Sequence, residues 1–337
     1  MAASPFHIPL IDISPYLTNP TSVTSSYVIA QVRQALHTTG FFQIIGHGVQ
    51  RNVQRAAFEA SKRFFNLPMG TKMKYAASLE SGWKGYETLA AQSYSPDMLG
   101  DLKEGVSLSM DLPEGHPLRG ARGHFLTSLT VWPEELASEQ YREPIEAYCD
   151  ALSKLCSTIL DLIAATLPYG PHVFDDMKVD AACPLRLLHY PPMPPSTDIN
   201  KQHGASAHTD FSALTLLLQD EHAGLEVYDP SSETWHVVQP KPDTYVVNLG
   251  DMMIKLLGNQ FKSGLHRVIN REKSDRYSIV YFFDGNRGFK LAPLDNNDPE
   301  ATNDKDNVMT CEEYMFDRLR SSFGRHNKHD MTLIEGR

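Results

Sequence analysis

The spacing of apolar positions changes about halfway along the chain. In the first half, apolar residues recur three and four positions apart over 25–39, 52–66 and 145–167. That spacing places them on one face of a helix, so each segment is predicted to be helical. Two short apolar runs, at 8–14 and 41–45, predict strands. The last helix is long enough to support one side of a sheet.

The second half of the chain has the pattern of short β-strands. Its apolar runs are brief, rich in β-branched and aromatic residues, and separated by turn-forming residues. Many short strands at such intervals favour a sandwich or barrel over alternating strands and helices. The predicted strands are 185–190, 214–219, 225–228, 235–238, 244–249, 265–270 and 277–283.

The segment between these halves is rich in Gly, Ser and Pro and only weakly periodic. Residues 76–128 are therefore expected to form loops and short strands, a common location for substrate contacts. A final helix is predicted over 310–323. The expected organisation is an N-terminal region (1–130), a supporting helix (131–180), a β-rich core (181–295), a C-terminal helical segment (296–333) and a cloning scar (334–337).

Composition and charge exclude several classes of protein. The chain has 337 residues, of which 41% are hydrophobic and 21% charged, which is typical of a folded globular protein. Its net charge is −10, from 31 Lys and Arg against 41 Asp and Glu, which disfavours a nucleic-acid partner. Four dispersed cysteines fit neither a disulfide framework nor a zinc site.

The same sequence gives no indication of a membrane. No apolar run reaches the roughly 18 residues that a spanning helix requires. The first residues, MAASPFHIPLIDISPYL, lack the charged and apolar regions of a signal peptide. We therefore expect a soluble, cytoplasmic protein whose partner is a small molecule, and the sequence does not set its oligomeric state.

One motif has the spacing of metal ligands. His208-Thr209-Asp210 is the only His-x-Asp motif in a chain with 14 histidines. In an extended segment, side chains two positions apart project to the same side and can meet at one ion. His266, in a predicted strand, is the candidate third ligand. Two imidazoles and one carboxylate that leave open positions are typical of non-haem Fe(II) oxygenases.

A second motif is suited to binding a small dicarboxylate. Arg276 and Ser278 open a predicted apolar strand and share one of its faces. A guanidinium group binds a carboxylate through two parallel hydrogen bonds and stays charged when water is removed. Tyr190, which precedes two prolines, is a candidate third hydrogen-bond donor, although a half-buried structural tyrosine is an equally good interpretation.

These motifs belong to a longer ordered series. IPLIDISPY, GFFQIIGHGV and DLKEGVSL are followed by HYPP, HTDFSALTLLLQD, GLEV, VVNLGD, SGLHRV and RYSIVYFF. Over about residues 7–320 the chain resembles the 2-oxoglutarate/Fe(II)-dependent dioxygenase superfamily, in the branch that includes isopenicillin N synthase, flavonoid oxygenases and gibberellin oxidases.

The resemblance implies a fold, a set of cofactors and an activity. The fold is mainly β with flanking helices, a double-stranded β-helix or distorted jelly roll. The implied iron ligands are His208, Asp210 and His266, and the implied 2-oxoglutarate contacts are Arg276, Ser278 and Tyr190. Fe(II), 2-oxoglutarate and O2 are the implied reactants, with ascorbate as the reductant in vitro. The implied reaction is the oxidation of an unactivated C–H bond of a small molecule, by hydroxylation, desaturation or a related outcome, in secondary metabolism.

Four aromatic residues are candidates for the substrate pocket. They are Trp83, Tyr86, Phe211 and Phe283. Any one of them is more often a core residue, but several rings around one pocket would favour a medium-sized, partly apolar molecule.

Three other functions stay open on the sequence. An oxidase of the isopenicillin N synthase type uses no 2-oxo acid, and it carries the Arg-x-Ser motif as well. A non-catalytic binder on the same fold would be expected to have lost a metal ligand, and all three are present. A metal-dependent hydrolase would leave Arg276 without a role.

Overall fold

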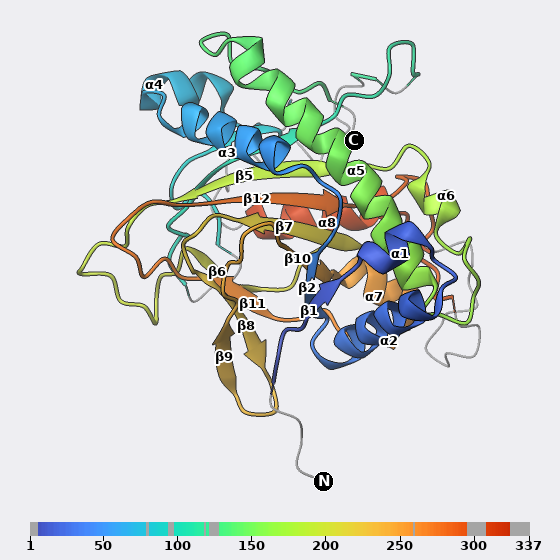
Figure 1. The fold of residues 1–337 in the computed structure, drawn as a ribbon. Coiled ribbons are helices and arrows are strands. Elements are labelled where there is room, and N and C mark those ends of the chain that lie inside the picture. The colour runs from blue at the N-terminus through green and yellow to red at the C-terminus, as the bar shows by residue number, and fades with distance from the viewer. Residues whose placement is uncertain are drawn as a thin grey trace.

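The protein folds around two β-sheets, with helices on the outside (Figure 1). The computed structural model describes residues 6–78, 81–93, 98–117, 119–120, 128–258, 260–294 and 308–323. The expected scar at 334–337 and most of the expected C-terminal segment lie outside the described residues.

The larger sheet has eight strands, and half of them come from the first 110 residues. The mainly helical N-terminal half therefore contributes strands to the same sheet as the β-rich half. In spatial order the strands are β1 (Leu10–Asp12), β2 (Phe41–Ile45), β10 (Tyr245–Leu249), β7 (Leu214–Gln219), β12 (Arg276–Phe283), β5 (Pro184–Tyr190), β4 (Glu104–Ser109) and β3 (Gly85–Glu87).

The smaller sheet has four antiparallel strands. Its order is β6 (Ala205–His208), β11 (His266–Val268), β8 (Leu225–Asp229) and β9 (Thr234–Val237). Apolar residues of both sheets, among them Val246 of β10, Val280 of β12 and Val227 of β8, form one buried cluster. The two sheets therefore enclose a common interior, as the predicted distorted jelly roll requires.

Helices cover the other face of the larger sheet. Helices α3 and α5 contact β5, β7 and β12 between them, and α5 crosses the sheet as a long rod (Figure 1). The helices are α1 (Ser14–Thr18), α2 (Val23–Thr38), α3 (Arg51–Phe65), α4 (Met69–Lys72), α5 (Arg142–Ala164), α6 (Asp175–Lys178), α7 (Asp251–Leu257) and α8 (Cys311–Phe323), with short 3-10 turns at Met73–Tyr75 and Ser138–Gln140.

Side-chain alternation divides β12 between these two environments. Ile279 and Tyr281 belong to the core shared with the helices, whereas Val280 belongs to the core between the sheets. Because strand side chains alternate with a period of two, Arg276 and Ser278 share the inward face with Val280. The sheet thus carries its charged residue into the interior at one end of β12.

The predicted helices and strands are confirmed, with ends that differ by a few residues. The structure adds β6 and the short helices α1, α4, α6 and α7, which the sequence pattern did not predict. Strand β6 reads ASAH, which has little β-propensity, and it forms because β11 pairs with it. Among the described residues, no helix has the length and apolar composition to cross a membrane.

Candidate metal centre and substrate cavity

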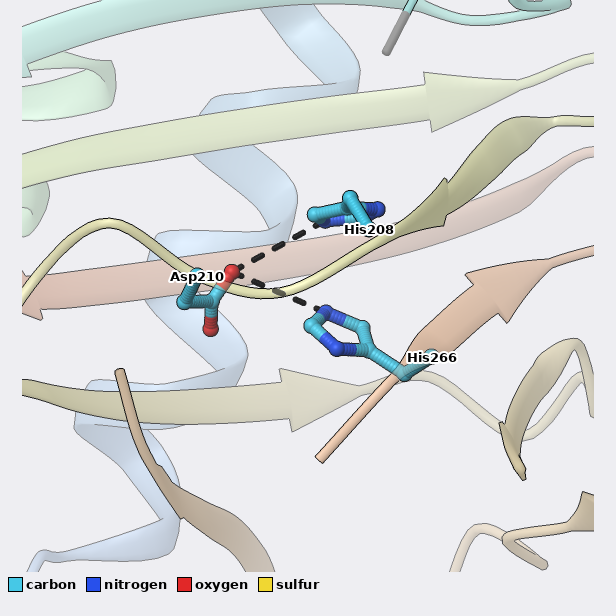
Figure 2. A group of neighbouring side chains, drawn as sticks. All are labelled: His208, Asp210 and His266. Atoms are coloured by element: carbon cyan, nitrogen blue, oxygen red, sulfur yellow. Dashed lines mark ion pairs between the residues drawn. The ribbon is translucent and has the colours of Figure 1, made fainter. Parts of the chain in front are cut away.

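The His-x-Asp motif and His266 meet between the two sheets (Figure 2). His208 ends β6 and His266 begins β11, and the two residues are direct antiparallel partners. Asp210 follows β6 in the connection to β7. The pairing of β6 with β11 therefore brings together ligands that are far apart in the sequence.

The three groups present one donor atom each toward a common point. Asp210 Oδ1 lies 3.7 Å from His208 Nε2 and 3.6 Å from His266 Nε2. The opposite ring nitrogens are engaged, because His208 Nδ1 lies 2.7 Å from the Ser206 carbonyl and His266 Nδ1 lies 3.1 Å from the Gly264 carbonyl. Each Nδ1 therefore donates to a backbone oxygen, and each Nε2 keeps its lone pair for a metal.

The carboxylate of Asp210 is oriented in the same way. Its Oδ2 accepts hydrogen bonds from Thr215 Oγ1 at 2.7 Å and from Asn248 Nδ2 at 2.8 Å. Both donors lie on strands of the larger sheet. Oδ1 is thereby directed at the two histidines, as in metal sites where outer contacts fix the ligands.

The electrostatics suit a site for a cation. Burial, followed by repulsion from His266, holds the pKa of His208 well below its ordinary value, so its ring is neutral. Burial opposes ionisation of Asp210, but the two imidazoles and the hydrogen bonds from Asn248 and Thr215 hold its pKa below the ordinary value. Two imidazoles and one carboxylate are the ligand set that fits Fe(II) with open coordination positions.

Arg276 lies fully buried where the predicted cosubstrate site should be. Its guanidinium carbon lies 4.9 Å from the centre of the Tyr190 ring, which belongs to the directly paired residue on β5. Nη2 donates to Gln219 Oε1 at 2.9 Å and Nε donates to the His222 carbonyl at 3.2 Å. Nη1 is buried without a hydrogen-bond partner among the described residues.

The unpaired Nη1 of Arg276 is suited to donate to a bound anion. A buried guanidinium with an open donor costs free energy unless a ligand accepts from it. Ser278 lies two residues along the same inward face, and Tyr190 packs against the guanidinium. The structure therefore brings the three predicted cosubstrate residues together around one open donor.

A cavity of about 410 Å³ adjoins the metal centre. Its wall includes His208 and Asp210, and it is completed by residues of β4, β5, α5 and α8. Trp83 and Phe211, two of the predicted substrate residues, lie in this wall.

The other two predicted aromatics do not line this cavity. Tyr86 faces away, is 2% exposed, and donates to Glu104 at 2.6 Å, while its neighbour Glu87 lines the cavity. Phe283 is likewise in the core, and its neighbour Phe282 lines the cavity. Strand alternation explains the correction at Tyr86, since Tyr86 and Glu87 point to opposite faces of β3.

Sequence reasoning missed several residues that the site uses. Thr215 and Asn248 orient Asp210, and Arg186 and Asp284 line the cavity. Each is a polar or charged residue within or beside an otherwise apolar strand, as in YVVNL or PLRLLHY. Buried polar groups in such places usually have a specific partner, and that was the available signal.

Family models match most of the chain. Residues 8–135 match the N-terminal region of a family described as non-haem dioxygenase in morphine synthesis. Residues 182–285 match the 2OG-Fe(II) oxygenase superfamily. The second match includes every predicted metal and cosubstrate residue.

Two fungal relatives match nearly the whole chain. The 2-oxoglutarate-dependent dioxygenase citB of Monascus ruber is 48% identical over 324 residues, which cover 95% of this chain and 97% of the relative. The clavatol oxidase claD of Penicillium crustosum is 43% identical over 330 residues, which cover 94% and 97%. Among solved structures, Neurospora crassa T7H in complex with alpha-KG and 5-formyluracil superposes with a TM-score of 0.77 at 24% identity, over 93% of this chain and 96% of that one.

Proposed function

The chain belongs to the 2-oxoglutarate/Fe(II)-dependent oxygenase superfamily, and from this premise we propose that His208, Asp210 and His266 hold its Fe(II) ion. Arg276, Ser278 and Tyr190 bind the distal carboxylate of 2-oxoglutarate. As an enzyme of this superfamily it uses Fe(II), 2-oxoglutarate and O2. The observation that carries the residue assignment is the convergence of two Nε2 atoms and Oδ1 on one point.

The chemistry divides between the reactants and the protein. When bound, the ferrous ion with 2-oxoglutarate and O2 supplies the oxidation of a C–H bond, and 2-oxoglutarate leaves as succinate and CO2. The chain holds the reactants in place. Backbone carbonyls of Ser206 and Gly264 fix the two imidazoles, and Thr215 and Asn248 fix the carboxylate.

The cosubstrate is oriented by the groups at the start of β12. The buried Arg276 offers its open Nη1 to the distal carboxylate, while Gln219 and the His222 carbonyl hold the rest of the guanidinium in position. The low exposure of Arg276 and Ser278 excludes water that would compete for the same hydrogen bonds.

The substrate is a small molecule that enters the cavity beside His208. The cavity volume, about 410 Å³, lies in the range of small-ligand sites. Trp83 and Phe211 are proposed as apolar contacts in its wall. The relatives citB and claD support a role in fungal-type secondary metabolism, and a cytoplasmic location stays a prediction of the sequence.

The metal assignment is tested by spectroscopy before any substrate is known. Anaerobic protein with Fe(II) should develop a visible charge-transfer band when 2-oxoglutarate is added, and His208→Ala should not. With O2 and ascorbate, the slow turnover of 2-oxoglutarate to succinate that occurs without substrate should fall to background in His208→Ala. His172→Ala is the matched control, because the His172 side chain is 85% exposed and lies outside the site.

The outcomes separate the competing functions. Full succinate formation by His208→Ala would show that the ligand assignment is wrong. Oxidation of a substrate with no succinate would indicate an oxidase that needs no 2-oxo acid. Absence of the band in the wild-type protein, with intact small-molecule binding, would indicate a non-catalytic binder.

A further inference from the structure

Asp284 is a buried carboxyl group without a partner in the wall of the substrate cavity. It follows directly on β12 and is 0% exposed. Neither of its carboxylate oxygens has a hydrogen-bond partner among the described residues. Buried polar groups in folded proteins are almost always hydrogen-bonded, so a carboxyl group with two open oxygens beside a cavity indicates a ligand.

The backbone holds this residue firmly in place. The Asp284 amide donates to the Ala182 carbonyl at 2.9 Å, and the Asn286 amide donates to the Met177 carbonyl at 2.8 Å. Gly285 between them has φ +78°, and a Cβ there would lie 2.7 Å from Met177 side-chain atoms. The turn therefore fits closely against α6, and the position of the carboxyl group is set by the fold.

Its side chain continues the inward face of β12. Arg276, Ser278 and Phe282 are spaced in steps of two along this face, and Asp284 is the next step. Phe282 and Asp284 both line the cavity. Arg287, the cationic residue that follows Asp284 in the same wall, is paired with Glu312 at 3.3 Å.

The protonation state defines what Asp284 can bind. Burial, followed by the negative charge of Asp210, raises the pKa of Asp284 to about 8. Near neutral pH the group is therefore mainly a neutral carboxylic acid, with one O–H donor and one carbonyl acceptor. Such a group recognises an oxygen atom that accepts or donates a hydrogen bond, and it gains little from a cation.

We propose that Asp284 is a substrate-binding residue that hydrogen-bonds a hydroxyl or carbonyl oxygen of an uncharged, ring-sized molecule. This inference rests on the proposed function, because it takes the cavity beside His208 and Asp210 as the substrate site. The size and character of the ligand follow from the rest of the wall. Trp83 and Phe211 provide apolar surface for a ring, and a volume of about 410 Å³ limits the ligand to a small molecule.

The proposal is tested with three probes of similar size: benzyl alcohol, ethylbenzene and benzylamine. They carry a hydroxyl, a methyl and an ammonium group on the same ring. Their dissociation constants are measured by ligand-observed NMR on anaerobic protein loaded with Fe(II) and 2-oxoglutarate. Asp284→Leu should weaken benzyl alcohol by roughly 10-fold, the value of one hydrogen bond, and leave ethylbenzene unchanged.

Asp284→Asn is the matched variant, because an amide keeps one acceptor and adds donors without a charge. It should bind benzyl alcohol nearly as well as wild type does. Infrared difference spectra should show the protonated Asp284 carbonyl stretch shifting on addition of benzyl alcohol, and no such band in Asp284→Asn. A variant that loses all three probes equally would show a structural role and overturn the proposal.

Two further outcomes are decisive. Preferential loss of benzylamine in Asp284→Asn would show that the residue binds a cation as a carboxylate, and the proposal would be wrong. The charge-transfer band with 2-oxoglutarate should persist in Asp284→Leu. If the band is absent from wild type as well, the metal assignment is wrong. The affinities for the three probes would still test the role of Asp284 separately.

Discussion

The two ends of β12 carry different polar groups into the interior, a guanidinium at its start and a carboxylic acid just beyond its end, and the two groups are held differently. At its start, Arg276 is held by Gln219, the His222 carbonyl and the face of Tyr190. Beyond its end, Asp284 touches the substrate cavity with both oxygens open. Eight residues separate them, which at about 3.3 Å per residue is roughly 26 Å of strand.

The difference follows from what each end must recognise. Under the proposed function, the cosubstrate end binds one constant molecule, 2-oxoglutarate. Its groups lie on paired strands that hold the guanidinium in one orientation. The cavity end combines β4 and β5 with α5, α8 and the connection before β5. The groups that hold Arg276, namely Gln219, the His222 carbonyl and Tyr190, do not line this cavity. We therefore expect substitutions at the two ends to act independently.

Removal of the Arg276 guanidinium should have the largest effect, and it should weaken 2-oxoglutarate binding without changing ligand binding in the cavity. Arg276→Leu leaves the distal carboxylate of 2-oxoglutarate without its charged partner, and truncating a buried charged hydrogen-bond pair commonly costs binding by roughly 100-fold or more. We expect the KM for 2-oxoglutarate to rise by that factor. The KM of Arg276→Lys should lie between those of wild type and Arg276→Leu, because lysine keeps the charge but lacks the two parallel N–H donors of a guanidinium.

The control for Arg276→Leu is binding at the other end. Its dissociation constant for benzyl alcohol should match that of wild type, and the KM of Asp284→Leu for 2-oxoglutarate should match as well. If Arg276→Leu weakens both ligands equally, the two ends are coupled and the comparison fails.

An intermediate effect is expected at the metal centre, whose His208 and Asp210 line the same cavity as Asp284. Asn248→Ala and Thr215→Val each remove one hydrogen bond to Asp210 Oδ2. Loss of such outer contacts typically reduces metal affinity about 10- to 100-fold. Titration with Fe(II) under anaerobic conditions should show this decrease, with the thermal unfolding of the metal-free protein little changed.

Thr244→Val is the matched control for Thr215→Val. Thr244 is also buried, but its hydroxyl donates to the Pro242 carbonyl, outside the metal centre. Equal Fe(II) affinity in the two Thr→Val variants would show that the hydroxyl of Thr215 does not orient the ligand.

The sequence predicted the cosubstrate end better than the cavity end, for a physical reason. Arg276 and Ser278, and likewise His208 and Asp210, belong to short motifs, because strand geometry places side chains two residues apart on one side. His266 lies far away in the sequence and was a candidate only as a histidine in a separate predicted strand. The cavity depends on which face of a strand a residue occupies, and the sequence pattern did not fix that face at Tyr86 or Phe283. Asp284 was missed because it directly follows the predicted strand 277–283, where the apolar pattern ends.

The overall architecture shows the same limit. Strongly apolar runs such as 214–219 and 277–283 were predicted because burial determines them directly. Strand β6 was missed because its residues have little preference for a strand and are ordered by pairing with β11. Local pattern thus predicts elements that bury their own apolar residues, and not those that form through a neighbour.

The smallest effect is expected behind the cosubstrate end, where His189 joins two carboxylates on the helix-facing side of β5. Its Nδ1 lies 2.7 Å from Glu104 and its Nε2 lies 2.9 Å from Asp275. Burial lowers the pKa of His189, but the hydrogen bonds to Glu104 and Asp275 outweigh this effect and raise the pKa above its ordinary value. Because the pKa of His189 is higher in the folded than in the unfolded protein, its protonation stabilises the fold. This contribution is fully present below about pH 6.5, the pKa in the unfolded chain, and is lost as the pH rises through the pKa in the folded protein.

Removing the ring should therefore flatten this part of the pH profile. Wild-type unfolding free energy, measured by urea titration, should decline above pH 6.5 by about 1 kcal/mol or less, since Asp275 is half exposed and its charge is screened by solvent. His189→Gln should lack that decline, and its affinity for benzyl alcohol should equal that of wild type. An identical decline in both proteins would show that His189 is not the titrating group. A change in the affinity for benzyl alcohol would show that the contacts of His189 influence the cavity. The expectation that the two ends act independently would then be wrong.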